Sequence, residues 1–343
     1  MHVVEVTPAY ERGYQRFAES CPTALFYHSL GFRDFVLRLL GCEQRYAVVL
    51  SGGEVVGAMP LMAASGPYGT VLNSLPYFGS NGGMLGGVEA RAVLADWYAA
   101  QLSEPGVAAG TVIANPLEAE STLALAGHLE DSRVGLITHL DGPGPPEELV
   151  LRSIDGSARR NVQKAIRSGV TVDVGDDGME VLERLHTANM VAIGGRSKDP
   201  QFFELVADHF RAGEDYNLYV ARVEGQAVAA LLVFYFGQTV EYYVPATDVG
   251  FRPLQPMAAI LHRAMADAVT RGFRNWNWGG SWTDHESLIR FKTKWGGRSH
   301  VYRYSTQVNA PELLSATPED LLASYPGFYV VPFSALTVTS ANL

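Results

Sequence analysis

The chain has 343 residues, of which 47% are hydrophobic, and its formal net charge is −10 at pH 7. This length predicts two domains, and the hydrophobic content predicts folded cores instead of a disordered chain. The acidic balance argues against a generally basic surface for nucleic acid and leaves room only for a local basic patch, so we expect no DNA partner.

The two cysteines, Cys21 and Cys42, form no CxxC pair, and the histidines lack the close spacing of metal ligands. We therefore expect reduced thiols, no metal and no cofactor. The first residues, MHVVEV, lack the basic segment and apolar run of a signal peptide, and no window approaches about 18 apolar residues. These features predict a cytoplasmic protein without integral membrane association, either a monomer or a homodimer.

The first half of the chain predicts alternating helices and strands, separated by glycine- and proline-rich turns. Helices are expected at 9–18, 32–40 and 90–102, and strands at 45–50, 55–62 and 110–115. The segment 66–87 is rich in loop-forming residues, and the prolines and glycines of 141–146 predict an inter-domain turn.

The second half predicts a similar order of elements. Helices are expected at 157–168, 178–193, 200–211 and 255–271, and strands at 170–174, 217–223, 227–235, 239–245, 273–278 and around 302–304. A strand, a glycine turn and a returning strand occur at 45–62 and again at 217–235. The pattern predicts two copies of one α/β fold with mixed sheets, in domains 1–145 and 150–318.

Three segments carry a resemblance to a known family. They are the arginine-rich helix at 158–170, the aromatic-proline-glycine loop at 75–83, and the Phe-Lys…Gly-Gly segment at 288–297. In this order they resemble the FemABX-type aminoacyltransferases of the GNAT superfamily, which have two tandem GNAT-like domains. The resemblance implies transfer of an amino acid from aminoacyl-tRNA to an amino group, typically of a peptidoglycan precursor. It also implies that the tail, about 320–343, returns to the first domain.

The donor is left open by two departures from known patterns. The chain lacks the long helical hairpin that some members of the family insert in the second domain and that is thought to touch tRNA. An acyl-CoA site usually has glycines at the start of the long helix, whereas the stretch 251–258 has none and includes Pro253 and Pro256. Aminoacyl-tRNA is the expected donor. The alternatives are an acyl-CoA-dependent N-acyltransferase of a surface-polysaccharide or secondary-metabolite pathway and a non-catalytic GNAT-like binding module.

Two residues are candidates for the chemistry. Lys292 lies between aromatic residues, and the glycine pairs 279–280 and 296–297 flank its segment. Its ammonium would stabilise the oxyanion formed when an amine attacks an ester; the alternative is a solvated helix lysine. Asp284 is the candidate acceptor of the proton from the attacking nitrogen, and the alternative is a solvated loop residue. An ester is already activated, so the reaction needs neither a metal nor an enzyme nucleophile.

Further residues are candidates for substrate binding, each with a purely structural alternative. Guanidinium groups bind phosphate in a bidentate manner, a loop arginine faces substrate in the resembled family, and aromatic side chains orient an amine or form a wall for a sugar or peptide. The alternatives are a solvated helix face, a loop cation and aromatic core packing. The candidates are Arg159, Arg160, Arg196, Tyr242, Tyr243, Trp278 (with Trp276 on the same strand face) and Phe291.

Overall fold

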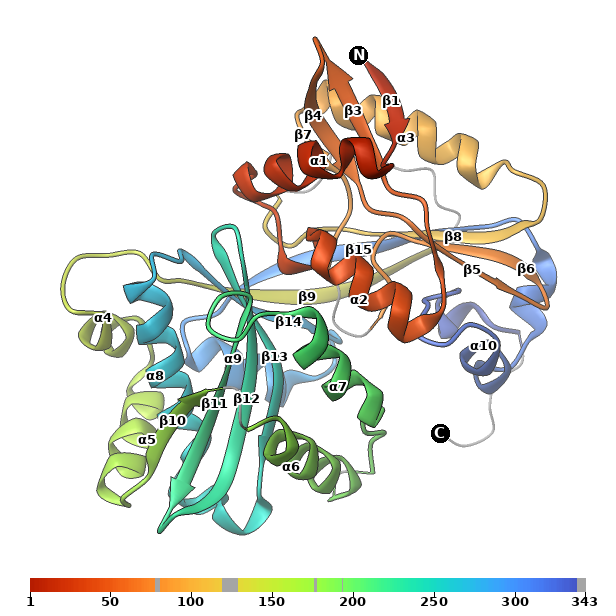
Figure 1. Ribbon diagram of the computed structural model, residues 1–343. Helices are drawn as coiled ribbons and strands as arrows, with labels where there is room; N and C mark the ends of the chain where they lie inside the picture. The colour runs from red at the N-terminus through yellow and green to blue at the C-terminus, as the bar shows by residue number, and fades with distance from the viewer. Residues whose placement is uncertain (78–80, 119–128, 176–177, 193, 338–343) are drawn as a thin grey trace. The chain divides into compact units, whose positions relative to one another are not determined.

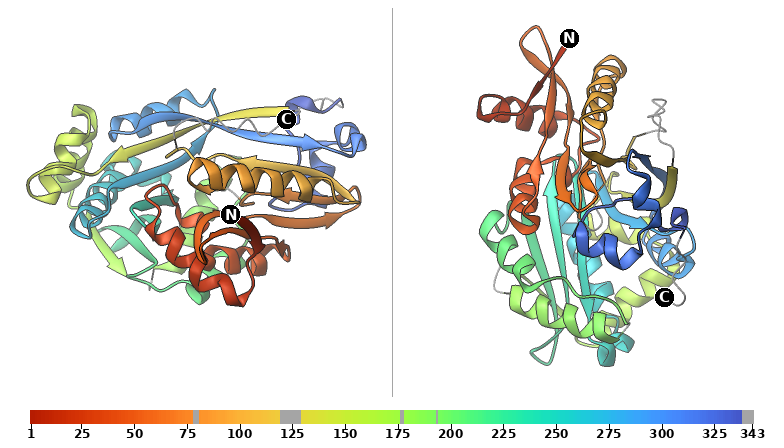
Figure 2. Two further views of the ribbon diagram at one scale, coloured as in Figure 1. Left: turned by 90° about the horizontal axis from the view of Figure 1, so that it is seen from above. Right: turned by 90° about the vertical axis from the view of Figure 1, so that its right-hand side faces the viewer.

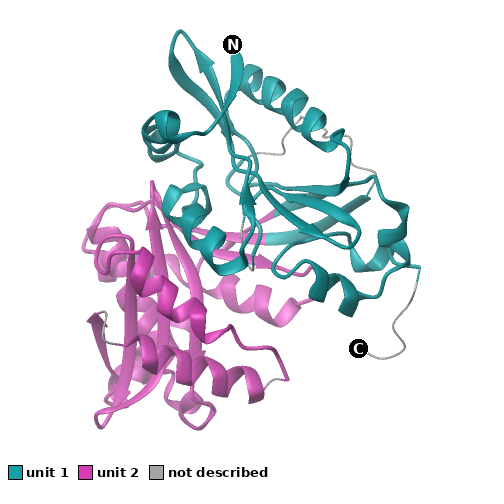
Figure 3. Cartoon of the chain, turned by 45° about the vertical axis from the view of Figure 1, so that its right-hand side comes forward, with its two compact units in different colours: residues 1–134, 301–343 teal, residues 135–300 magenta. Residues whose placement is uncertain are grey.

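The computed structural model describes residues 1–77, 81–118, 129–175, 178–192 and 194–337. The chain divides into two compact units, residues 1–134 with 301–343 and residues 135–300 (Figure 3). These boundaries differ from the domain limits expected at 145 and 318. The reason is that two strands, β9 (Leu129–His139) and β15 (Arg298–Val308), each run from one unit into the other.

The first unit has two sheets and a helical cover. One sheet has the strand order β1-β3-β4-β7. The strands that this unit contributes to the other sheet have the order β15-β8-β6-β5-β2. The strands are β1 (His2–Glu5), β2 (Glu43–Gln44), β3 (Ala47–Ser51), β4 (Glu54–Met59), β5 (Met62–Gly66), β6 (Gly69–Asn73), β7 (Leu85–Gly86) and β8 (Val107–Ile113). The helices are α1 (Pro8–Ser20), α2 (Leu30–Leu40), α3 (Val88–Leu102) and α10 (Pro318–Ser324). Leu94 and Tyr98 of α3 pack into the core formed with β3 and β4.

Two expectations for this unit were wrong in part. The returning strand expected at 55–62 ends at Met59, and the chain enters β5 in the other sheet after Pro60, whose ring nitrogen has no hydrogen to donate to a ladder. The segment expected to be loop-rich holds β6. Residues 78–80 of the family-like loop lie outside the described residues; before them, Tyr77 has φ +85° and donates its N–H to Gly327 O at 2.7 Å.

The C-terminal tail is held to β6 by hydrogen bonds. Tyr325 Oη donates to Gly69 O at 2.9 Å, and the Asn73 side chain donates to Tyr329 O at 2.8 Å and accepts from Tyr329 N at 2.7 Å. From residue 325 to 337, the last residue described, the tail has a 3-10 turn (Phe333–Ala335) and no strand.

The second unit is a sheet covered by helices on both faces. Its order is β10 (Thr171–Gly175), β11 (Tyr216–Val223), β12 (Gln226–Phe236), β13 (Thr239–Thr247), β14 (Asn275–Ser281) and β9. The helices are α4 (Pro146–Ser153), α5 (Gly156–Arg167), α6 (Met179–Ala192), α7 (Pro200–His209), α8 (Pro256–Thr270) and α9 (Glu286–Lys294). Figures 1 and 2 show α6 and α7 on one side of β11–β13, with α5 and α8 on the other.

The sheet of this unit is irregular at β13. Val233 of β12 pairs with Tyr242 and Leu232 pairs with Val244, so Tyr243 is the extra residue of a β-bulge. The parallel pairing of β13 with β14 covers three residue pairs and ends at Glu241 and Asn277. Both strands continue beyond this point, to residues 247 and 281. Because a bulge bends its strand, the two strands separate here and leave room beside β13.

Candidate functional site

An aromatic cluster lies where the two strands separate. Trp276 and Trp278 share one face of β14, with ring centroids 5.8 Å apart, and both are buried. Tyr242 from β13 lies 5.0 Å from Trp278, and Phe291 from α9 meets Trp278 edge to face at 6.0 Å. Trp278 also donates a hydrogen bond to Thr138 Oγ1 at 2.9 Å. The two tryptophans therefore pack in the core, while Tyr242 and Phe291 border the space beyond it.

Lys292 points into the protein behind this cluster. It is 3% exposed, and its Nζ donates to Ser281 Oγ at 2.9 Å and to Gly279 O at 3.4 Å. The interpretation as a solvated helix lysine is therefore wrong. Burial disfavours the charged form and lowers the pKa of Lys292 to about 8. The ammonium is still the main form at pH 7, held by two oxygens and with a third N–H that these bonds do not use.

The two glycine pairs around Lys292 have separate local reasons. Gly279 has φ +69°, a conformation that favours glycine, and its carbonyl accepts from Lys292. Gly296 has φ +79°, and a Cβ there would lie 2.8 Å from Ser153 O. A Cβ on Gly297 would lie 2.8 Å from Lys292 O. Glycine at both positions therefore lets the chain leave α9 closely packed and keeps Lys292 at the end of a helix.

An open cavity of about 440 Å³ lies beside the part of β13 that is not paired with β14. Its lining includes apolar and aromatic side chains as well as a guanidinium, amides and a hydroxyl. The lining residues come from β13, α6, the start of α8 and α9: Asn189, Tyr242, Pro245, Ala246, Thr247, Arg252, Gln255, Pro256, Met257 and Phe291. Arg252 is oriented by a 2.9 Å hydrogen bond to Asn189 Oδ1. A mixed apolar and polar cavity of this size suits an acyl or aminoacyl group.

A smaller groove of about 200 Å³ runs between α5 and α9 and shares Phe291 with the cavity. Arg290 and Lys294 line it from α9, and Asn161 lines it from α5. The backbone N–H of Asp155, the N-cap of α5, donates to Lys294 O at 2.8 Å and ties the two helices together. The groove therefore presents two cations close to the cavity. Lys294 itself is exposed.

The arginine candidates are all exposed, and their contacts differ. Arg159 donates to Leu151 O at 3.1 Å, so it is partly used to hold α4 to α5. The guanidinium of Arg160 folds back onto the first turn of α5, with Nη1 3.5 Å from the position of a Cβ on Gly156. Arg196 lies in the loop between α6 and α7. None of the three lines the described cavity or the groove beside it.

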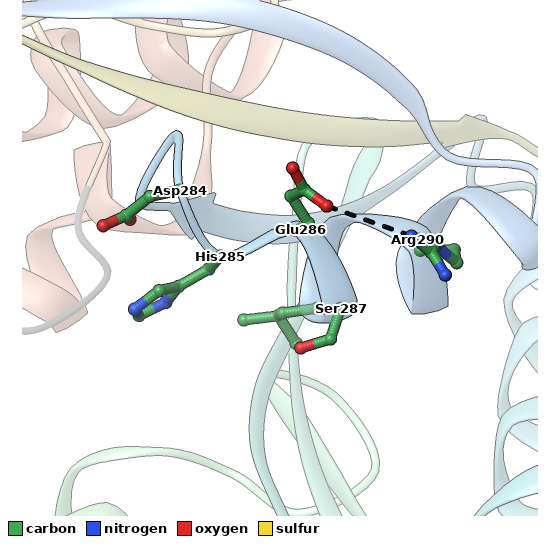
Figure 4. Close-up of a pocket in the computed structure, with 6 residues that line it drawn as sticks. Asp284, His285, Glu286, Ser287 and Arg290 are labelled. Atoms are coloured by element: carbon green, nitrogen blue, oxygen red, sulfur yellow. Dashed lines mark ion pairs between the residues drawn. The ribbon is translucent and has the colours of Figure 1, made fainter.

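Asp284 lies on the exposed loop that leads into α9. It borders an open surface hollow with Glu286 and Arg290, which form a 3.9 Å ion pair (Figure 4). Asp284 is not among the residues that line the 440 Å³ cavity. The structure thus groups Tyr242 and Phe291 at the cavity, with Lys292 next to Phe291 in sequence, and leaves Asp284 outside this group.

Tyr243 faces away from the cavity and contacts Lys198, a residue that the sequence analysis missed. Its ring is parallel to that of Phe202 at 5.9 Å, and Lys198 Nζ lies 5.2 Å from the Tyr243 ring and 4.6 Å from the Phe202 ring. The signal in the sequence was the spacing of Lys198 and Phe202, one helical turn apart across the start of α7.

Residues 152–292 match the family model described as an acetyltransferase (GNAT) domain. The matched stretch carries β10 to β14, with the bulge and the separated strands described above, and the fold as a whole is mixed α/β with GNAT-like sheets.

Solved structures share the fold over about nine-tenths of the chain. FemX matches with a TM-score of 0.74 at 16% identity, covering 91% of this chain and 98% of that one. A conserved protein from Bacteroides thetaiotaomicron matches with a TM-score of 0.55 at 11% identity, covering 90% and 99%. A tandem GNAT protein from the clavulanic acid biosynthesis pathway matches with a TM-score of 0.50 at 14% identity, covering 90% and 98%. A sequence comparison with curated proteins finds no match.

Two negative findings concern the described residues only. No helix among them is long and apolar enough to cross a membrane. No group of three or more His, Cys, Asp or Glu side chains among them is placed to hold a metal ion.

Proposed function

We propose that the protein is an N-acyltransferase of the Fem-like kind, which transfers an activated aminoacyl group to a primary amine by direct aminolysis. The observation that carries this proposal is the buried Lys292, which is held by Ser281 Oγ and Gly279 O and directly follows Phe291, a residue that lines the cavity. A buried cation is suited to a reaction that develops negative charge.

The chemistry follows from the groups present. The neutral amine attacks the ester carbonyl carbon, and the C–N bond forms as the carbonyl oxygen becomes an oxyanion. The Lys292 ammonium stabilises that oxyanion, or the leaving ribose oxygen, in a site with little water. The C–O bond to the donor then breaks, and the proton of the attacking nitrogen goes to the leaving oxygen. Tyr242 and Phe291 border the space for the acyl group.

The proposed donor is aminoacyl-tRNA, and the proposed acceptor is an amino group of a peptidoglycan precursor or a similar amine. The likeness of the whole chain to FemX supports this choice, and so do the missing glycines at the start of α8. Pro256 at the first position of α8 has no N–H to offer to a pyrophosphate. Arg160 and Arg159 on α5 are the proposed contacts to phosphate, and Arg196 is proposed to support the acceptor side.

A second candidate is an acyl-CoA-dependent N-acyltransferase. It is favoured by the position of the cavity, which Gln255 and Met257 line at the start of α8, where an acyl-CoA enzyme of this fold would hold its donor. Arg252 at the polar side would then meet the anionic part of the donor.

The test offers charged tRNA pools and acyl-CoAs separately, each with candidate amine acceptors, and identifies products by mass spectrometry. The proposal expects product with charged tRNA and a loss of at least about a hundredfold in turnover for Lys292→Met. Lys164→Met, an exposed lysine on α5, is the matched control and keeps turnover. Product with acyl-CoA alone supports the second candidate. A folded protein that yields no product with either donor supports a binding module.

A further inference from the structure

Lys198 has no role in the proposed reaction, and its surroundings are unusual for a lysine. The sequence holds four lysines among 26 lysine and arginine residues, and two of the four, Lys292 and Lys198, have their ammonium groups against the protein interior. Lys198 lies in the loop 194–199, and its ammonium is seated over two aromatic faces, those of Phe202 and Tyr243. Such cation–π contacts are attractive and directional.

The Lys198 loop is attached to three elements at this point. Its backbone N–H donates to His186 Nε2 of α6 at 3.2 Å. Phe202 belongs to α7 and is fully buried. Tyr243 belongs to β13, and its ring also meets Phe234 of β12 edge to face at 5.1 Å. One side chain therefore links the loop between two helices to the strand that shapes the cavity.

The attachment point is the β-bulge itself. Tyr243 is the extra residue of the bulge, and the residue before it, Tyr242, faces the opposite side of the sheet and lines the 440 Å³ cavity. The same loop carries Arg196, two residues before Lys198. An interaction that fixes the Tyr243 ring therefore also restrains the backbone of the neighbouring Tyr242.

The charge of Lys198 carries a desolvation cost that its cation–π contacts oppose. Burial lowers the pKa of Lys198 to about 7, which means that the surroundings disfavour the charged form, whereas the two ring faces favour it. A methionine of similar length would fill the same space without a charge to desolvate, so this substitution isolates the effect of the ammonium.

We propose that Lys198 is a positioning residue whose ammonium, seated on the faces of Phe202 and Tyr243, fixes the bulge of β13 and the loop that carries Arg196. It thereby sets the position of Tyr242 at the cavity. The structural part of this proposal stands on its own, and its kinetic consequence rests on the proposed N-acyltransferase function.

The structural part is tested by hydrogen exchange measured by mass spectrometry on the whole chain. Lys198→Met is expected to speed exchange in peptides covering 194–199 and 240–245, whereas Lys198→Arg keeps slow exchange because a guanidinium also stacks on aromatic faces. Lys164→Met is the control and leaves both peptides unchanged. Unchanged exchange in Lys198→Met overturns the proposal, as does an increase spread evenly over residues 135–300.

The kinetic part uses the transfer assay. Lys198→Met is expected to lower kcat about tenfold, because a small displacement of a substrate-contacting group is costly, and Lys198→Arg restores most of it. Equal loss in both variants, or no loss in Lys198→Met, overturns the kinetic role. Absence of product from the unsubstituted protein is instead a failure of the proposed function, and the exchange experiment then decides the positioning role alone.

Discussion

Lys292 Nζ donates a hydrogen bond to Ser281 Oγ at 2.9 Å, and this contact joins the end of α9 to the end of β14. Ser281 is 4% exposed, so the bond lies inside the protein. A hydroxyl can accept from the ammonium without neutralising it, unlike a carboxylate. The pair therefore keeps an uncompensated positive charge in a buried place, which costs stability and suits the stabilisation of a developing anion.

The first prediction is that the charge of Lys292 destabilises the fold. Its pKa is about 8 in the folded protein against 10.5 in the unfolded chain, so at pH 7 the desolvated ammonium costs about 3 kcal/mol. Lys292→Met removes that cost but leaves Ser281 without its partner. We expect the free energy of unfolding to rise by about 1–3 kcal/mol in urea denaturation at pH 7.

The sign of the pH dependence gives an independent check. Between pH 8 and 10.5 the unfolded chain binds more protons at this lysine than the folded protein, so stability from this group rises with pH. The gain in free energy of unfolding that Lys292→Met gives over the unsubstituted protein should therefore decrease by about 2 kcal/mol between pH 7 and pH 9.5. Lys164→Met, which is exposed, should change stability little at either pH. A constant advantage across this range contradicts the assignment.

The second prediction concerns the pH dependence of transfer. The reaction needs the protonated form of Lys292, so kcat/KM should fall as pH rises through about 8, in addition to the rising limb given by deprotonation of the acceptor amine. Lys292→Arg stays charged at these pH values. The pH profile of the activity that Lys292→Arg retains should therefore lack the fall in kcat/KM. A limb that persists in Lys292→Arg would belong to another group.

Much of the fold was predictable because its elements follow local rules. The glycine turns, the helix at 255–271 ended by a glycine and the alternating apolar strands all follow from periodicity and turn chemistry. The aromatic face shared by Trp276 and Trp278 followed from the two-residue period of a strand. Several elements were missed, among them β1, β6 and α10, as well as α4, directly after the predicted turn at 141–146, and β9, which shows no clean alternation.

Of the candidate residues, Tyr242 and Phe291 line the cavity, but the geometry of the site could not be predicted. Lys292 was selected from its sequence setting and the family resemblance, yet its burial depends on Ser281 and on the chain path after α9. The bulge at Tyr243 depends on the pairing of β12 with β13, which no local pattern reveals. Lys198 was missed for the same reason: one of its two aromatic partners comes from β13, far along the chain.

The third prediction concerns the cavity between β13 and α8. Met257 lines it and is only partly buried, so a larger side chain can be placed there without disturbing the core. Met257→Trp should raise KM for the acyl donor about tenfold, because the ring fills space that the acyl group needs. Val191→Trp on α6, where the side chain is 74% exposed, is the control for adding a tryptophan. Unchanged KM in Met257→Trp would mean that the donor binds elsewhere.

The fourth prediction separates the two neighbouring arginines of α5. Arg160 lies folded onto the positive N-terminal end of α5, which also favours an anion, whereas Arg159 is engaged with Leu151 O. If the donor or the acceptor carries phosphate, Arg160→Gln should raise the KM for that substrate about fivefold in low salt. The difference in KM between Arg160→Gln and the unsubstituted protein should become smaller in about 0.5 M salt, because exposed charges are then screened.

Arg167→Gln, at the other end of the same helix, controls for the loss of one positive charge. An equal rise in KM for Arg160→Gln and Arg167→Gln would indicate a diffuse effect of net charge. If the rise in KM for Arg160→Gln does not change with salt, the arginine acts by packing instead of by charge.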